Sequence, residues 1–133
     1  MNVVGQWLEE TRRDLLAAAG CIAEKFVVPD RAAFHVQQAS EKLAKAALVA
    51  HEIRPGRTHD ICEIVDALPE RFPLRVRFVA LDRFSEYAVI FRYPGEHRPA
   101  IPSVAEVETW IEEIEVLKAD FERWLATRNQ DAP

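Results

Sequence analysis

The spacing of apolar residues predicts a helix at each end of the chain. Between residues 3 and 26, apolar side chains recur every three or four positions, as in a helix with one buried face. From residue 103 the spacing returns in a longer stripe: Val104, Val107, Ile111, Ile114, Leu117, Phe121, Trp124 and Leu125. Ser103 is placed to cap this last helix, and Glu106 completes the Ser-x-x-Glu pattern of a capping box.

Residues 30–53 predict a helix that is apolar on most of its faces. Pro29 precedes it, and Asp30 is a suitable cap for its first turn. Few polar residues interrupt the run of Phe34, Val36, Ala39, Leu43, Ala46, Ala47, Leu48 and Ala50. A helix of this kind is normally covered on several sides by other elements. We therefore expect it to be the central helix of the fold.

Two further segments complete the pattern. Thr58 is a good cap for a short helix over residues 58–68, which stops before Pro69. Residues 74–91 predict a fourth helix by their length and three-to-four spacing, although Val76, Val79 and the run 88–91 alternatively favour a strand. A loop rich in proline follows over residues 93–102.

The sequence thus predicts an all-α fold, an antiparallel up-and-down bundle of four long helices plus one short helix. With 133 residues, of which 49% are apolar, the chain is long enough for one domain with a core. We expect this domain to span residues 1–128 and residues 129–133 to form a disordered tail.

Other features of the sequence exclude several classes of protein. It has no apolar run near the roughly 20 residues of a membrane span and no signal-peptide pattern, so we expect a cytoplasmic protein that does not enter the membrane. Cys21 and Cys62 lack the spacing of metal ligands and are expected to be small buried hydrophobes. We predict no metal and no cofactor.

Charge is distributed unevenly. The formal net charge is −5, which argues against a protein that simply coats nucleic acid. Residues 103–133 contain eight acidic and three basic residues, whereas residues 1–102 contain fourteen of each, so the acidic excess belongs to the last helix. Its glutamates are most simply a solvated face, and they would also repel nucleic acid toward the other side of the protein.

The turn at residues 54–59, Arg-Pro-Gly-Arg-Thr-His, concentrates the chemistry of the chain. Two guanidinium groups next to a helix start suit an anion such as phosphate. Arg54 and Arg57 compete for that role, and His59 adds a group that can exchange a proton near neutral pH. Alternatively, His59 caps the short helix or bonds across the bundle, and the arginines are merely solvated.

Four pieces of the sequence carry a resemblance to a known family. They are Trp7-Leu8 with residues 14–19, His-Val-Gln-Gln-Ala-Ser-Glu-Lys-Leu-Ala-Lys-Ala at 35–46, Thr-His-Asp-Ile at 58–61 followed by Leu68, and Arg-Tyr-Pro-Gly at 92–95. In their order, spacing and helical context they resemble the HEPN family (higher eukaryotes and prokaryotes nucleotide-binding) over nearly the whole chain.

The resemblance implies a homodimer that acts on RNA or nucleotides. Many members carry Arg, four to six residues and then His, and act as metal-independent ribonucleases, often as the toxin of a toxin–antitoxin-like pair with a minimal nucleotidyltransferase. Arg54 and His59 fit this spacing and are therefore the implied catalytic residues. Active members usually have a polar residue where this chain has Pro55, and Ile61 replaces the tyrosine that is modified in some members.

Two alternatives from other classes remain open. The chain could be a non-catalytic nucleotide-binding or partner-binding subunit of a nucleotidyltransferase complex, as Pro55 favours. It could also be an interaction protein whose last helix docks a partner.

The remaining candidate residues would contact the nucleotide or RNA. They are Arg57, Asp60, Gln38, Glu41, Lys45, Arg92 and Tyr93. Those of the second helix would line the cleft, although Glu41 and Lys45 are also placed to form an ordinary pair one helical turn apart. Tyr93 could stack on a base or pack on a proline.

Dimerisation is also expected on physical grounds, because the second helix is too apolar for the surface of a small monomer. In an isologous dimer, two copies of His59 and Arg54 could share one cleft.

Overall fold

The computed structural model describes residues 2–25, 27–88 and 99–131, and every regular element in these ranges is helical. The elements are, in order, α1 (Val3–Gly20), α2 (Pro29–Ala50), α3 (Ile61–Asp66), α4 (Arg75–Val79), the 3₁₀ helix η1 (Ala80–Tyr87) and α5 (Val104–Asp131). Because α4 runs directly into η1, the two form one helical segment. The predicted all-α bundle is confirmed.

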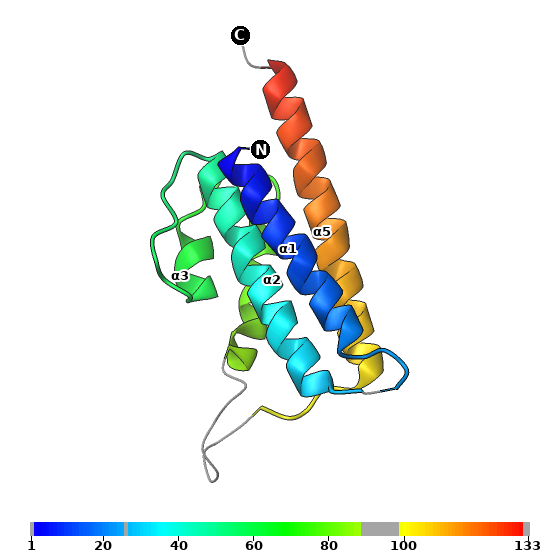
Figure 1. Cartoon of the computed structure of the whole chain (residues 1–133). Coiled ribbons are helices and arrows are strands. Elements are labelled where there is room, and N and C mark those ends of the chain that lie inside the picture. Colours follow the sequence, from blue (N-terminus) through cyan, green and yellow to red (C-terminus); the bar gives the residue numbers. More distant parts are fainter. Residues whose placement is uncertain (1, 26, 89–98, 132–133) are drawn as a thin grey trace.

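The long helices lie side by side as an up-and-down bundle (Figure 1). α1 is antiparallel to both α2 and α5, and α3 lies on the opposite side of α2 from α1 (Figure 1). α2 contacts α1, α3, η1 and α5, so the prediction of a central second helix is confirmed. Its apolar residues, including Val36, Ala39 and Leu43, are fully buried within this one chain. The expectation that α2 needs a dimer to cover it is therefore wrong, and dimerisation stays a prediction.

A cluster of aromatic rings fixes the segment before α4 against α5. The ring of Phe72 lies 5.5 Å from that of Phe78 and 4.8 Å from that of Trp124, measured between ring centres. Phe78 in turn lies 5.7 Å from Phe121, mostly edge to face. Such pairs add to the stabilisation that burying the rings already provides.

Several helix ends differ from the prediction. α1 ends at Gly20 rather than near residue 26. Pro29 occupies the start of α2, whose cap residue Val28 makes no side-chain hydrogen bond, so the prediction that Asp30 caps this helix is wrong. Asp30 lies inside the first turn, where a carboxylate is favourable because it faces the positive end of the helix dipole.

Of the caps predicted for the later helices, that of α3 is wrong and that of α5 is correct. Asp60, not Thr58, caps α3, because the Asp60 side chain accepts a hydrogen bond from the Cys62 N–H at 3.0 Å. The capping box of α5 is confirmed: the Glu106 N–H donates to Ser103 Oγ at 3.0 Å, and the Ser103 N–H donates to Glu106 Oε1 at 3.1 Å.

Two smaller expectations concern α4 and the cysteines. Val76 and Val79 lie in a helix, which rules out the strand alternative there, whereas residues 89–91 lie outside the described ranges. Cys62 is exposed, so its predicted burial is wrong, and Cys21 is partly buried.

Candidate functional site

The connection between α2 and α3 carries the candidate site. Glu52 adopts a left-handed conformation with φ 60°, and the Ile53 N–H closes the end of α2 by donating to the Leu48 carbonyl at 3.0 Å. Gly56 provides a second left-handed residue with φ 68°, a conformation that favours glycine. These two turns direct the chain back along α2. It reaches the level of Glu41, which lies about 13 Å along the helix before the last residue of α2.

His51 is the first residue of this connection, and its side chain is held by a hydrogen bond and two aromatic rings. Its Nδ1 bonds to the Ala47 carbonyl at 2.8 Å, and its ring lies 4.6 Å from Phe72 and 5.0 Å from Trp124. Burial lowers the pKa of His51; the hydrogen bond to Ala47 opposes this shift, and the nearby Arg128 and Arg71 add to it. A neutral imidazole therefore fits this aromatic pocket.

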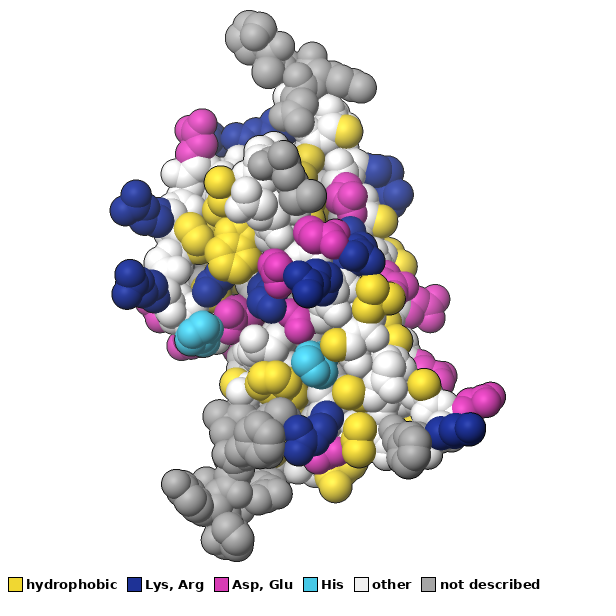
Figure 2. Space-filling view, viewed as in Figure 1, with side chains coloured by type: hydrophobic (Ala, Val, Ile, Leu, Met, Phe, Trp, Pro, Cys, Tyr) yellow, Lys and Arg dark blue, Asp and Glu magenta, His cyan; other side chains and the backbone are white. Residues whose placement is uncertain are grey.

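The arginines of the connection are exposed. Figure 2 shows Lys and Arg side chains projecting from the edge of the molecule occupied by α3 and the loop before it. Arg54 and Arg57 are exposed, and within the described ranges neither forms a hydrogen bond or ion pair. Both are therefore available to an anionic ligand, but the protein does not fix either guanidinium in one position.

At the start of α3, where the anion site was predicted, local hydrogen bonds already use part of the helix end. The N–H of Cys62 is already bonded to Asp60, which also places a negative charge there. Thr58 Oγ1 accepts from the Asp60 N–H at 3.1 Å and donates to Glu63 Oε2 at 3.0 Å. These local bonds use the N–H groups of Asp60 and Cys62, so phosphate binding here would rest mainly on the guanidinium groups.

His59 is held by a buried carboxylate of the central helix. Its Nδ1 lies 3.1 Å from Glu41 Oε2. The histidine side chain is 79% exposed, whereas that of Glu41 is only 3% exposed. Because a carboxylate only accepts hydrogen bonds, Nδ1 carries the proton in this contact. The other ring nitrogen, Nε2, is left to face an incoming ligand.

The same carboxylate pairs with a buried lysine. Lys45 Nζ lies 3.4 Å from Glu41 Oε2 and 5.4 Å from the centre of the Trp7 ring. The expected pair one turn apart is therefore confirmed, but it is buried rather than solvated, with the Lys45 side chain 5% exposed. The second carboxylate oxygen, Oε1, is buried and has no hydrogen-bond partner among the described residues. Burying these charges costs solvation that the single ion pair only partly offsets.

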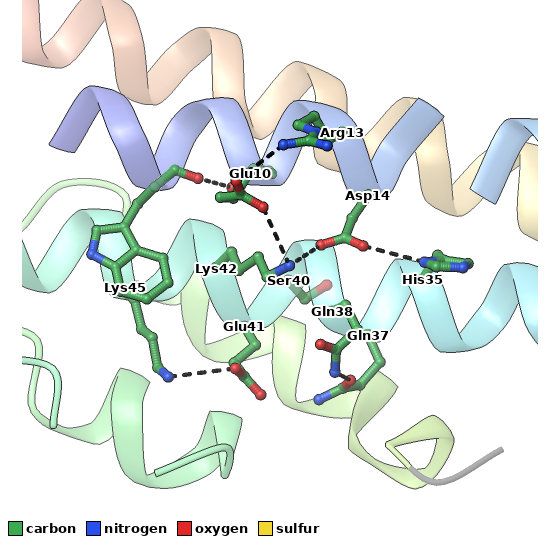
Figure 3. A network of polar contacts seen from close by, with 12 residues as sticks. Glu10, Arg13, Asp14, His35, Gln37, Gln38, Ser40, Glu41, Lys42 and Lys45 are labelled. Atoms are coloured by element: carbon green, nitrogen blue, oxygen red, sulfur yellow. Dashed lines mark hydrogen bonds and ion pairs between the residues drawn. The ribbon is translucent and has the colours of Figure 1, made fainter. Parts of the chain in front are cut away.

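Two glutamines extend this polar strip of α2. The Gln38 side-chain amide donates to Gln37 Oε1 at 2.6 Å. In Figure 3 both amides lie on the same side of α2 as the Glu41 carboxylate. Gln38, Glu41 and Lys45 thus share one strip with His59 beside it, whereas no contact joins Arg54 to them. That they line a ligand-binding cleft stays a prediction. Arg92 and Tyr93 lie outside the described residues.

Sequence reasoning missed a second polar network, which joins α1 to α2. Asp14 Oδ1 accepts from His35 Nδ1 at 3.2 Å, and Asp14 Oδ2 accepts from the Lys42 ammonium (Figure 3). Glu10 lies 3.9 Å from the same ammonium. The only sequence signal was the helical spacing of the acidic pair on α1 and of the basic pair on α2. Which pair meets which depends on how the helices pack.

Together these features define a small all-helical protein in which a buried acidic residue of the central helix presents an exposed histidine. The chain matches the family model of the HEPN domain over residues 4–124. It therefore belongs to the HEPN domain family, as its sequence motifs indicated, and this family supports a function related to nucleotides or RNA. In comparisons with curated proteins and with solved structures, no match was found. None of the described helices is long and apolar enough to span a membrane.

Proposed function

We propose that this protein is an endoribonuclease that works without a metal ion and uses His59 and Arg54. It would be the RNA-acting half of a toxin–antitoxin-like pair with a minimal nucleotidyltransferase. The observation that carries the proposal is the contact between His59 and Glu41, in which a buried carboxylate orients an exposed imidazole. An acid or base of this kind is what cleavage next to a ribose 2′-hydroxyl requires.

The proposed chemistry uses this contact as follows. Nε2 of His59 takes the proton of the 2′-hydroxyl, whose oxygen then bonds to the adjacent phosphorus. The bond from phosphorus to the 5′ oxygen breaks, leaving a cyclic phosphate, and the departing 5′ oxygen takes up a proton. Glu41 stabilises the imidazolium formed in the first step, because it accepts the Nδ1–H. Arg54, with Arg57 as its rival, neutralises charge on the phosphate oxygens.

A homodimer would supply the second proton-transfer group. If two copies associate across a two-fold axis near the connection between α2 and α3, each His59 meets its counterpart. One imidazole then acts as the base and the other as the acid. This step rests on membership of the HEPN family and on the exposure of His59.

The test is cleavage of a mixed RNA pool in the presence of EDTA. We expect the wild-type protein to cut and both His59→Ala and Arg54→Ala to lose the activity. His35→Ala and Arg13→Ala are the matched controls, because they remove the same side chains outside the site. If the wild type cuts no better than the His59 and Arg54 variants, the ribonuclease proposal is wrong.

One observation favours a second function, a non-catalytic nucleotide-binding subunit of a nucleotidyltransferase complex. No described residue holds the guanidinium of Arg54, and Pro55 follows it directly. An arginine free to move suits binding better than precise stabilisation of a transition state. In that case, nucleoside triphosphates would raise the melting temperature of the wild type but not that of Arg54→Ala. A nucleotidyltransferase reading frame beside this one would support pairing under either function.

A further inference from the structure

The outward face of α5 carries a row of unpaired glutamates. Glu108, Glu112 and Glu115 are exposed, and none of them forms a hydrogen bond or ion pair with a described residue. Their neighbours differ, because Glu113 pairs with Arg83 and Glu122 pairs with Lys118. Like charges one helical turn apart repel each other and weaken the helix. None of the three carboxylates of this row is therefore paired with a basic group in the described structure.

Apolar grooves lie on both sides of this row. The groove between α1 and α5 has a volume of about 250 Å³ and is lined in part by Leu15, Leu16 and Ala119. The groove between η1 and α5 has a volume of about 380 Å³, and Leu81 and Val116 contribute to it. Leu16 is 59% exposed and Val116 is 50% exposed, so each groove offers a large apolar side chain to a partner. The face thus combines a row of acidic residues with partly apolar grooves. The basic residues that line the grooves are Arg12 and Lys118 on one side and Arg77 and Arg83 on the other.

We propose that this face is a docking surface for a basic amphipathic helix of another protein. Lysine or arginine side chains of that helix would pair with the three glutamates, while its apolar residues would enter the grooves at Leu16 and Val116. The argument for a basic partner is charge complementarity, since α5 contains eight acidic and three basic residues. Helices of this kind commonly bind in apolar grooves through residues spaced three or four apart.

The same charges argue against other occupants. In a two-fold contact between copies of this chain, the row of glutamates would face its own copy and repel it. RNA phosphates would be repelled for the same reason. The proposed RNA site lies beside α3, on the opposite side of α2 from α1 (Figure 1), so a helix bound at α5 leaves it open. This inference does not depend on the ribonuclease proposal.

A titration with a designed peptide tests the inference. The probe is an 18-residue peptide with leucine at every third or fourth position and lysine elsewhere, added to the ¹⁵N-labelled 133-residue chain. We expect amide shift changes in residues 108–122 of α5 and 12–16 of α1. The variant Glu108→Gln/Glu112→Gln/Glu115→Gln should weaken binding about tenfold, the combined effect of three exposed ion pairs. Shift changes confined to other parts of the protein would overturn the inference.

Two controls separate a specific surface from general attraction to an acidic protein. Glu63→Gln/Glu70→Gln/Glu86→Gln removes the same charge from exposed positions outside α5 and should change the dissociation constant by less than about twofold. A peptide of the same composition without an apolar face should bind at least tenfold more weakly. If both triple variants weaken binding equally, or the scrambled peptide binds as well, the docking surface does not exist.

A last measurement addresses a second copy as the occupant. Sedimentation velocity of the wild type and of Leu16→Asp/Val116→Asp should give the same oligomeric state, while the double variant loses peptide binding. If the substitutions instead dissociate a wild-type dimer, the face is an interface between copies, and the inference is overturned.

Discussion

The molecule contains two contacts between a histidine and a carboxylate that are nearly identical in length but differ in their surroundings. His59 Nδ1 lies 3.1 Å from Glu41, and His35 Nδ1 lies 3.2 Å from Asp14. The Asp14 carboxylate also bonds Lys42, so both its oxygens are used, whereas one oxygen of Glu41 has no partner. His35 is 31% exposed and sits on a helix, while His59 is 79% exposed and sits on a loop.

The two contacts use the same kinds of group in different surroundings. The contact between His35 and Asp14 belongs to a network of polar contacts that joins α1 to α2, and we call it the closed contact. In the contact between His59 and Glu41, the histidine side chain is exposed to solvent and the carboxylate is buried. A buried acid orients the ring, and the exposed ring can meet a ligand. We therefore propose a structural role for the first contact and, in line with the proposed ribonuclease, a functional role for the second.

The largest expected difference is in activity. If the assignment is right, His59→Ala should lower the rate of RNA cleavage by about 10²- to 10⁴-fold, the usual contribution of a general acid or base. His35→Ala should change that rate by less than about twofold, once corrected for folded protein. Initial rates on one fluorescent RNA substrate, with folding checked by circular dichroism, measure both effects. Equal losses of cleavage rate in the two variants would contradict the proposal that only the His59 contact is functional.

The next effect is on stability and concerns the buried acid. Glu41→Gln should lower the free energy of unfolding by on the order of 3 kcal/mol, because it leaves the Lys45 ammonium buried without a counter-charge. The double variant Glu41→Leu/Lys45→Met should recover most of that loss, since it removes both charges together. Urea denaturation of the three proteins gives the values. A double variant as unstable as the single one would show that the ion pair is not the cause.

We expect that double variant to remain inactive on RNA although it is stable, because His59 has lost the group that orients it. Stability and activity then separate, which a purely structural role for Glu41 does not predict.

A smaller loss of stability is expected at the closed contact. Asp14→Asn should lower the free energy of unfolding by about 1 kcal/mol, because Lys42 and His35 are partly exposed and water replaces much of the lost interaction. Its activity per folded molecule should stay close to that of the wild type. Urea denaturation and the RNA assay measure the two quantities on one preparation. A large loss of activity without a loss of stability would instead indicate that the contact of Asp14 with His35 has a functional role.

The smallest expected effect involves His51, which has no carboxylate partner in the described structure. Burial lowers its pKa in the folded protein, so the unfolded chain binds its proton at higher pH, near the ordinary value of about 6.5. Below that pH the unfolded state binds more protons, and the free energy of unfolding falls as the pH falls toward the lowered pKa. The variant His51→Phe keeps an aromatic ring and should flatten this fall. Urea denaturation between pH 5 and 7.5 is the measurement, and an unchanged slope would contradict the expectation.

Much of the fold was determined by the sequence, because it depends on neighbours within one helical turn. The apolar spacing predicted α1, α2 and α5, and the apolar character of α2 on most sides predicted its central place. The capping box of Ser103 and Glu106 was correct because both hydrogen bonds link residues three positions apart. The choice between Thr58 and Asp60 as the cap of α3 was missed, since both residues can serve and the path of the preceding loop decides.

The arrangement of the candidate site was decided only by the tertiary structure. His59 and Glu41 are 18 positions apart, and their contact depends on the left-handed residues Glu52 and Gly56, which turn the chain back along α2. The family motifs brought both residues to attention, but no local rule pairs them. The sequence predicted the pair of Glu41 and Lys45 but not that packing would bury both side chains. Local sequence patterns indicate which residues are candidates for such a site. The burial of these residues and the contacts between distant ones are decided by how the helices pack.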